Sequence, residues 1–163
     1  IAGALNLCRD FANKDPVLVI LGDNIFEDEL SKMISEFEIC KQMRHNAPAA
    51  MFMLKKVQDP QRFGVATVEN TKITKIVEKP KNPESDLCVT GVYIYDGYVF
   101  GYVSQCNKSG RGEYEISDVN NLYVSSGGAK FIECAGWWTD AGTLKSYHLA
   151  NSLYALDKNY EKI

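Results

Sequence analysis

Two aspartates that follow apolar or aromatic runs are the residues best suited to chemistry in this sequence. Asp23 closes the apolar run of residues 17–22, and Asp140 follows an aromatic pair and precedes a short Ala-Gly-Thr turn. Ligands of open α/β sheets gather beyond the carboxyl ends of strands, so an acidic residue there is a candidate ligand. Two carboxylates from separate loops can share one Mg²⁺ and leave its other positions to water and phosphate. The alternative for each aspartate is a turn or helix-capping role.

Two further segments could hold a phosphate group. Glu78-Lys79-Pro80 closes an alternating segment and combines an acceptor for sugar hydroxyls with an ammonium group for phosphate. Arg111 lies between two glycines, which would let a phosphate approach it closely. Each segment is a weak signal alone, because Glu-Lys pairs are common on surfaces and Gly-Arg-Gly is typical of an exposed turn.

Alternating helices and strands are predicted to position these groups. Helices are expected at residues 1–11, 27–45, 98–105, 116–125 and after 143, and strands at residues 17–21, 49–57, 63–69, 72–79, 87–96 and 130–134. The β-branched run at 17–21 predicts a strand buried on both faces of a parallel sheet. A turn at Asn70-Thr71 predicts a hairpin. Together they predict one α/β unit with a mixed sheet.

The apolar spacing also predicts which helical residues pack. Leu5, Leu7 and Phe11 fit one helical face in the first segment. In the second helix, which Glu27, Asp28 and Glu29 are expected to open, the apolar face would be Leu30, Met33, Ile34 and Phe37.

The composition excludes several classes of function. The chain has 163 residues, 45% of them hydrophobic, and a net charge of -3, so it can bury a core but has no general attraction for nucleic acid or acidic membranes. Its longest apolar run is too short to span a bilayer, and the N-terminus lacks a secretion signal. Five scattered cysteines without a C-x-x-C pair are expected to be reduced. We therefore expect a cytoplasmic protein without nucleic-acid or membrane partners.

Six short motifs occur in a fixed order along the chain. They are LGDN at 21–24, RFGV at 62–65, VEKPKNP at 77–83, VTGVYIYD at 89–96, GEYEISDVN at 112–120 and WTDAGT at 138–143. This series resembles the glucose-1-phosphate thymidylyltransferases, within the wider sugar nucleotidyltransferase family. The resemblance covers nearly the whole chain, and its specificity lies in the order of the motifs.

The resemblance implies a Rossmann-like three-layer α/β fold with a mixed central sheet. It also implies an enzyme that joins glucose 1-phosphate to dTTP and releases pyrophosphate. By motif match, Asp23 and Asp140 would hold Mg²⁺ and would be catalytic together with Lys79. The sugar-phosphate site would be lined by Gly64, Glu78, Lys79, Val89, Tyr93, Arg111 and Trp138, with Lys79 and Arg111 toward the phosphate. Its partners would be a sugar 1-phosphate and a nucleoside triphosphate, and the intact enzyme is expected to be a homo-oligomer.

Two departures from the family pattern limit this expectation. Phe63 stands where family members usually carry Tyr, so a hydroxyl is missing there. No glycine-rich G-x-G-T-R-like segment, which cradles the triphosphate in the family, occurs in the sequence. We therefore expect residues 1–163 to be a single nucleotidyltransferase domain that is incomplete at the N-terminus and inactive alone.

Three other functions remain open at this point. An enzyme of the same fold could use UTP or act on another sugar 1-phosphate, because the family chooses its base largely through the N-terminal part. A catalytically silent relative could bind sugar phosphate without transferring it, although the presence of both Asp23 and Asp140 argues against that. A purely structural α/β domain is disfavoured by the ordered series of motifs.

Overall fold

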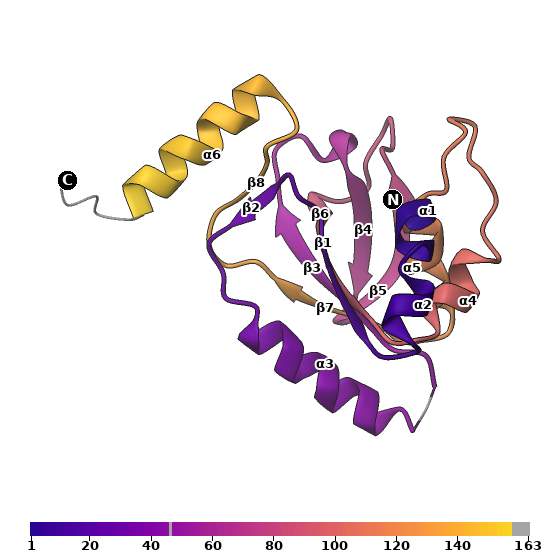
Figure 1. Ribbon diagram of the computed structural model, residues 1–163. Helices are drawn as coiled ribbons and strands as arrows, with labels where there is room; N and C mark the ends of the chain where they lie inside the picture. The colour runs from indigo at the N-terminus through magenta and orange to yellow at the C-terminus, as the bar shows by residue number, and fades with distance from the viewer. Residues whose placement is uncertain (46, 158–163) are drawn as a thin grey trace.

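The computed structural model describes residues 1–45 and 47–157 as a central sheet between two layers of helices (Figure 1). Six strands form this sheet: β1 (Val17–Ile20), β3 (Ala50–Lys56), β4 (Gly64–Glu69), β5 (Lys72–Glu78), β6 (Leu87–Tyr95) and β7 (Ala129–Glu133). β3 and β7 are parallel, whereas the other pairs are antiparallel. The predicted α/β fold with a mixed central sheet is therefore confirmed.

β6 is the central strand, and its two edges are used differently. β3 pairs along one edge, from Leu87 to Tyr95. The other edge is shared by two strands, because β4 pairs with residues 88–89 and β1 pairs with residues 92–95. Residues 90–91 lie between these two partners, so the sheet opens on that side of β6.

Helices cover both faces of the sheet (Figure 1). One layer consists of α1 (Ala2–Asn6), α2 (Arg9–Ala12), α4 (Val99–Val103) and α5 (Ile116–Ser125), and the other is α3 (Ser31–Met43). The first layer shares a core with Phe52 and Tyr95 of the sheet, to which α5 contributes Tyr123. On the other face, α3 buries Met33 and Phe37 against a second group of sheet residues. Each layer thus excludes water from one side of β3 and β6.

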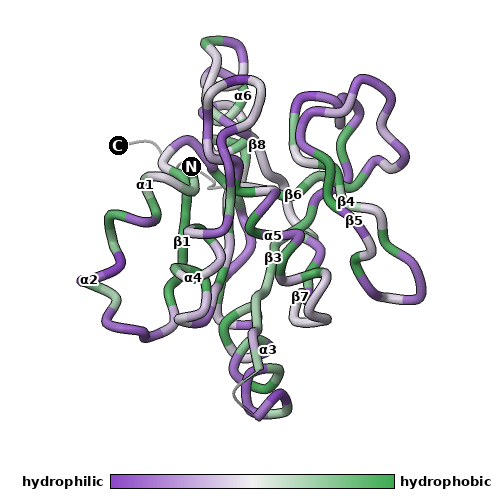
Figure 2. The backbone as a smooth tube through the Cα atoms, turned by 90° about the vertical axis from the view of Figure 1, so that its right-hand side faces the viewer, coloured by the Kyte–Doolittle hydropathy of each residue, from purple (hydrophilic) through white to green (hydrophobic). Residues whose placement is uncertain are grey.

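A second, two-stranded sheet stands apart from the main one. It pairs β2 (Asn24–Phe26) with β8 (Trp138–Asp140) in antiparallel register, with Asn24 opposite Asp140. The 3₁₀ helix η1 (Pro60–Arg62) precedes β4, and α6 (Leu144–Asp157) follows β8. In the side view, α6 and α3 extend from opposite ends of the molecule, and the β4–β5 hairpin lies on the side away from α1 and α2 (Figure 2).

The predicted hairpin is confirmed. β4 and β5 pair antiparallel from Gly64–Glu78 to Glu69–Lys72. The turn residues Asn70 and Thr71 have φ values of 47° and 63°. Two consecutive positive φ angles are typical of the type I′ turn, whose twist matches that of paired strands.

The prediction for β1 was wrong in two respects. β1 is antiparallel to β6, and it pairs with no other strand among the described residues. Its alternate side chains are partly exposed, with Leu18 at 42% and Ile20 at 45%. A continuous β-branched run specifies a strand, but its neighbours are set by distant segments, which the run itself does not reveal.

Two helix predictions also need correction. The first predicted helix breaks after Asn6 into α1 and α2, so that Leu5 is buried whereas Leu7 and Phe11 are 86% and 93% exposed. The break rotates the two pieces relative to each other and removes the single apolar face. The α3 helix begins at Ser31, four residues later than predicted, and Ile34 is 43% exposed. Glu27 and Asp28 do not open it.

Two expectations about composition can be compared with the structure. All five cysteines are free, as predicted. Within the described ranges, no helix has the length and apolar character needed to cross a membrane.

Candidate active site

A cleft of about 190 Å³ lies beside β6, where β4 and β1 separate. Its walls come from the segment before β2, the start of β4, the end of β5, the N-terminus of α5 and β8. The sequence-predicted site residues other than Arg111 line it: Asp23, Gly64, Glu78, Lys79, Val89, Tyr93, Trp138 and Asp140. Residues from both halves of the chain therefore meet at the opening in the sheet.

The carboxylates of Asp23 and Asp140 both lie close to Gly142. A β-carbon on Gly142 would lie 3.3 Å from Asp23 Oδ2 and 3.8 Å from Asp140 Oδ2. The backbone joins the same two segments, because the Ala141 N–H donates to the Asp23 carbonyl at 2.6 Å. Neither aspartate caps a helix: α6 is instead preceded by a reciprocal contact in which the Thr143 N–H donates to Ser146 Oγ and the Ser146 N–H to Thr143 Oγ1.

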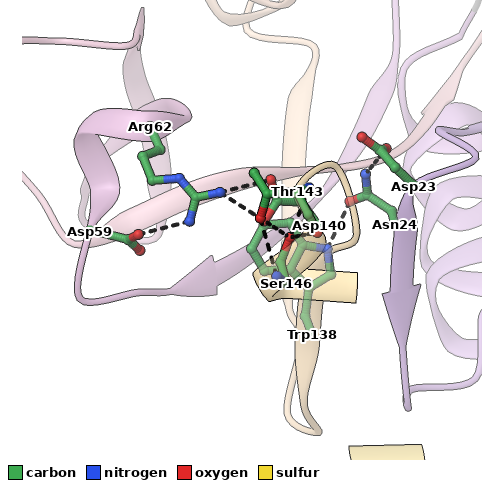
Figure 3. Close-up of polar contacts among 8 residues, drawn as sticks. All are labelled: Asp23, Asn24, Asp59, Arg62, Trp138, Asp140, Thr143 and Ser146. Carbon is green, nitrogen blue, oxygen red and sulfur yellow. Dashed lines mark hydrogen bonds and ion pairs between the residues drawn. The ribbon is translucent and has the colours of Figure 1, made fainter. Parts of the chain in front are cut away.

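Asn24 connects the two sides of the cleft, and the sequence reasoning did not single it out. Its Nδ2 donates to Asp23 Oδ1 at 2.9 Å, and its Oδ1 accepts the Trp138 Nε1–H at 2.8 Å (Figure 3). The same Oδ1 also accepts the Gly91 N–H at 2.8 Å. The side chain is almost fully buried. Each contact uses one half of the amide, so the side chain fixes Asp23 and Trp138 relative to β6.

Arg62 forms an ion pair with Asp140. Its Nη2 lies 3.0 Å from Asp140 Oδ2 and its Nη1 lies 2.9 Å from Asp59 Oδ2 (Figure 3). The hydrogen bond to Asp59 and the charge of Asp140 raise the pKa of Arg62, against the opposing effect of burial. Asp140 is therefore partly neutralised by an exposed guanidinium, which could be displaced at little cost.

Phe63 closes the same wall through aromatic contacts. Its ring meets that of Trp138 edge to face, with 5.2 Å between the centroids, and the Arg62 guanidinium lies 5.0 Å from its centroid. A tyrosine hydroxyl, which the family pattern would place here, is not needed for this packing.

Glu78 and Lys79 lie at the end of the β4–β5 hairpin. A β-carbon on Gly64 would lie 3.4 Å from Glu78 Oε2, so the glycine leaves room beside that carboxylate. Lys79 has a φ of 43°, which is uncommon for a residue with a side chain. Its N–H donates to the Phe63 carbonyl at 2.9 Å, and this bond holds the unusual backbone in place.

Arg111 does not line the cleft, but it lies next to a residue that does. Its Nη2 is 2.8 Å from Glu115 Oε2 and 3.6 Å from Glu78 Oε1. The hydrogen bond from Arg111 to Glu115 raises the pKa of the guanidinium. Arg111, the residue predicted to bind phosphate, is thus paired with the acidic Glu115 and lies beside Glu78 at the edge of the cleft.

Two hydroxyl groups inside the cleft remain available for a ligand. Burial raises the pKa of Tyr93, and the charge of Glu78 raises it further, so the phenol stays protonated. Ser117, which the sequence reasoning missed, is buried and its Oγ has no hydrogen-bond partner among the described residues. A buried hydroxyl without a partner is unfavourable, and a ligand hydroxyl could satisfy it.

The donor set fits a divalent cation that keeps most of its ligands from water and phosphate. Asp23 and Asp140 offer carboxylate oxygens, the ligand type that Mg²⁺ prefers. Within residues 1–45 and 47–157 no group of three or more His, Cys, Asp or Glu could enclose a metal by itself. The site therefore suits a cation brought together with a phosphate ligand better than a metal held entirely by protein.

A sequence model of the family described as Nucleotidyl transferase matches residues 1–156. The chain belongs to the nucleotidyl transferase family. It is similar to a glucose-1-phosphate thymidylyltransferase of Neisseria meningitidis serogroup A, with 35% identity over all of this chain and 56% of the relative. It is also similar to a low-salt glycan biosynthesis nucleotidyltransferase of Haloferax volcanii, with 32% identity over 99% of this chain and 44% of the relative. The predicted family resemblance is confirmed.

Solved structures of the family agree with this fold. A Bacillus anthracis protein assigned as a glucose-1-phosphate thymidylyltransferase, in complex with a sucrose, has a TM-score of 0.86 and 48% identity, covering 99% of this chain and 63% of that one. A UDP-glucose pyrophosphorylase from Acinetobacter has a TM-score of 0.79 over 98% of this chain and 57% of that one, but at 22% identity it shows the fold alone. The chain spans about half the length of the curated relatives that it matches.

Proposed function

We propose that this chain supplies the sugar-phosphate and metal-binding part of a glucose-1-phosphate thymidylyltransferase. The observation that carries the proposal is the convergence of Asp23 and Asp140, which come from motifs far apart in the sequence, on the same cleft as Glu78 and Lys79. The similarity to glucose-1-phosphate thymidylyltransferases of several bacteria supports the choice of substrates.

Each side chain has a role that its chemistry allows. Glu78 accepts hydrogen bonds from sugar hydroxyls, and Lys79 donates to the sugar phosphate. Trp138 and Tyr93 form walls of the sugar pocket, because aromatic faces pack against the apolar side of a sugar ring. Gly64 and Val89 leave space and backbone groups beside Glu78. The Arg111 guanidinium binds the sugar phosphate after Arg111 has separated from Glu115.

The reaction needs no protein nucleophile. The phosphate oxygen of the sugar is already anionic near neutral pH and attacks the α-phosphate of the nucleotide in line. The new bond joins that oxygen to the α-phosphorus as the bond to the pyrophosphate leaving group breaks. The main barrier is repulsion between anions, which the positive charges of Lys79 and Arg111 reduce. The cleft also orients the two reactants for in-line attack. A Mg²⁺ ion held by Asp23 and Asp140 would neutralise charge on both reactants.

Turnover by the purified protein that contains this chain tests the proposal. Pyrophosphate release from glucose 1-phosphate is measured with dTTP and, separately, with UTP, each with and without Mg²⁺. We expect Mg²⁺-dependent release that is faster with dTTP. Faster release with UTP would favour the alternative of a UTP-using enzyme, and binding of glucose 1-phosphate without release would favour a silent relative.

We further propose that residues 1–163 alone do not complete the reaction. The chain lacks the glycine-rich segment that the family pattern assigns to the triphosphate, and it spans about half the length of its relatives. The isolated chain should bind glucose 1-phosphate but form no nucleotide sugar, and robust turnover by it would refute this part of the proposal. Assembly into a homo-oligomer and a cytoplasmic location remain expectations from the family.

A further inference from the structure

Two acidic side chains that follow β2 bind the backbone of the segment that precedes β8. Asp28 Oδ1 accepts the Gly136 N–H at 2.6 Å, and Asp28 Oδ2 accepts the Ala135 N–H at 2.8 Å. Glu27 Oε2 accepts the Trp137 N–H at 3.0 Å. The Glu27 N–H in turn donates to the Trp137 carbonyl at 3.1 Å. We call this set of contacts the loop clamp.

Lys55 of β3 binds the same segment through its carbonyl groups. Its Nζ donates to the Cys134 carbonyl at 3.0 Å and to the Gly136 carbonyl. Burial raises the pKa of Asp28, but the N–H groups of the segment and the charge of Lys55 outweigh burial and hold this pKa below its ordinary value. The carboxylate is therefore charged at neutral pH, and charge-assisted hydrogen bonds are the stronger kind.

Gly136 is closely enclosed by the clamp. A β-carbon at this position would lie 2.6 Å from Asp28 Oδ1 and 2.8 Å from Glu27 Cβ. Any larger residue would have to push the two acidic side chains away. The absence of a side chain is thus what lets both carboxylates reach the backbone of residues 135–137.

The clamp matters because the sheet that it adjoins is small. β2 and β8 have three residues each, and an isolated pair of short strands is marginally stable. The side chains of Asn24 and Trp138 are hydrogen-bonded across this pair, and the clamp holds the end of the pair at which Phe26 lies opposite Trp138. A loss of the clamp would let β8 shift, and β8 carries both Trp138 and Asp140.

We propose that Asp28 is a positioning residue that, through the loop clamp, sets where β8 places Asp140 opposite Asp23. This inference rests on the proposed function, because it assigns Asp28 a part in the affinity for the divalent cation. Asp28 touches no reacting group itself. Its effect is on the arrangement of the metal ligands.

Asp28→Asn is the variant that tests the proposal, because it keeps the shape of the side chain but removes the charge and one of the two acceptors. Glu29→Gln is the matched control, since the Glu29 carboxylate makes no hydrogen bond or ion pair with any described residue. Both variants are made in the purified protein that contains this chain. Mg²⁺ binding is measured by calorimetry in the presence of saturating glucose 1-phosphate, and backbone hydrogen exchange is measured over residues 135–140.

Fluorescence adds a third, local measurement. Residues 1–163 contain two tryptophans, Trp137 in the clamp and Trp138 in the cleft wall, so within this chain tryptophan emission reports on this segment. In Asp28→Asn we expect faster exchange of the amides of residues 135–137, a shifted emission maximum and roughly 10- to 100-fold weaker Mg²⁺ binding, the range typical of residues that orient metal ligands. Glu29→Gln should match the wild type in all three.

The outcomes separate this inference from the proposed function. Wild-type protein that binds no Mg²⁺ even in the presence of glucose 1-phosphate would refute the proposed metal site itself. Wild-type binding that Asp28→Asn leaves unchanged, even with faster exchange in the segment, would refute only the positioning role. If Asp28→Asn does not fold, Glu27→Ala removes a single acceptor from the clamp and is expected to show the same three changes at smaller amplitude; unchanged Mg²⁺ affinity in that variant would overturn the proposal.

Discussion

The side chain of Asn24 occupies the space beside β6 that a β-carbon on Gly91 would need. Asn24 Cγ lies 2.6 Å from that position, and Asn24 Oδ1 accepts the Gly91 N–H. Because the same amide also holds Asp23 and Trp138, the glycine on β6 and the carboxylate at the cleft are directly linked. A change at Gly91 should therefore be felt at the site and not only in the core.

Gly91→Ala should destabilise the fold and loosen the cleft. The added methyl group would displace Asn24, and overpacking of this kind costs about 1–3 kcal/mol. The free energy of unfolding is measured in urea, together with Mg²⁺ affinity. Gly101→Ala is the control, because a β-carbon there meets open space in the helix α4. That change should be neutral or stabilise by up to about 1 kcal/mol; equal losses in both variants would argue against a special role for Gly91.

Asp23→Asn should abolish most turnover while leaving the fold intact. Asp23 is exposed to solvent at the cleft, so removing its charge leaves no buried group unpaired. In the intact protein that contains this chain, we expect a loss of turnover by orders of magnitude with an unchanged unfolding midpoint. Asp59→Asn is a suitable control, because Asp59 is the other carboxylate on Arg62 but does not line the cleft. Wild-type turnover in Asp23→Asn would remove this residue from the metal site.

Glu115→Gln should change the binding of sugar phosphate. The carboxylate is nearly buried and accepts hydrogen bonds from Ser109 and Arg111, which outweigh burial and lower its pKa. Without that charge, Arg111 should leave this partner more readily and bind the sugar phosphate, as proposed above. The expected result is a several-fold lower KM for glucose 1-phosphate with kcat changed less. Glu113→Gln, which removes a more exposed and more distant partner of Arg111, should leave KM unchanged.

Asp28 should contribute to stability in a pH-dependent way. Its pKa is lower in the folded protein than in the unfolded chain, so its contribution is fully present near neutral pH. That contribution is lost as the pH falls below about 4 and through the folded-state pKa. Lys55 and Cys134 are the titratable side chains that lower this pKa, Lys55 by its charge and Cys134 by a hydrogen bond. The difference in unfolding free energy between wild type and Asp28→Asn should therefore shrink in acid, and a difference that is constant with pH would contradict this assignment.

The sequence predicted the elements whose signal is local. The β4–β5 hairpin follows from alternation and an Asn-Thr turn, and β6 follows from a long run of β-branched and aromatic residues. β2 and β8 were not predicted, because strands of three residues show no periodicity. The neighbours of β1 were predicted wrongly, because strand order depends on contacts between distant segments.

The site could be predicted to a similar extent. Asp23 and Asp140 could be singled out from their positions after apolar and aromatic runs, and the order of motifs indicated their companions. Asn24 could not, although it stands beside Asp23 in the LGDN motif, because its other two partners, Gly91 and Trp138, lie far away in the sequence. The pairing of Arg111 with Glu115 was also missed, since the Gly-Arg-Gly triplet does not reveal which acid will meet the guanidinium.

Because β2 pairs with β8, we expect the cleft to form late in folding. Asn24 and Trp138 are 114 residues apart along the chain, so their contact closes a very long loop. The entropy lost in closing such a loop is recovered only after the intervening strands have packed. The amount of ligand bound at this cleft would therefore measure the fraction of fully folded molecules in a preparation. Far-ultraviolet circular dichroism would also include chains in which the helices and the hairpin have formed but the cleft has not.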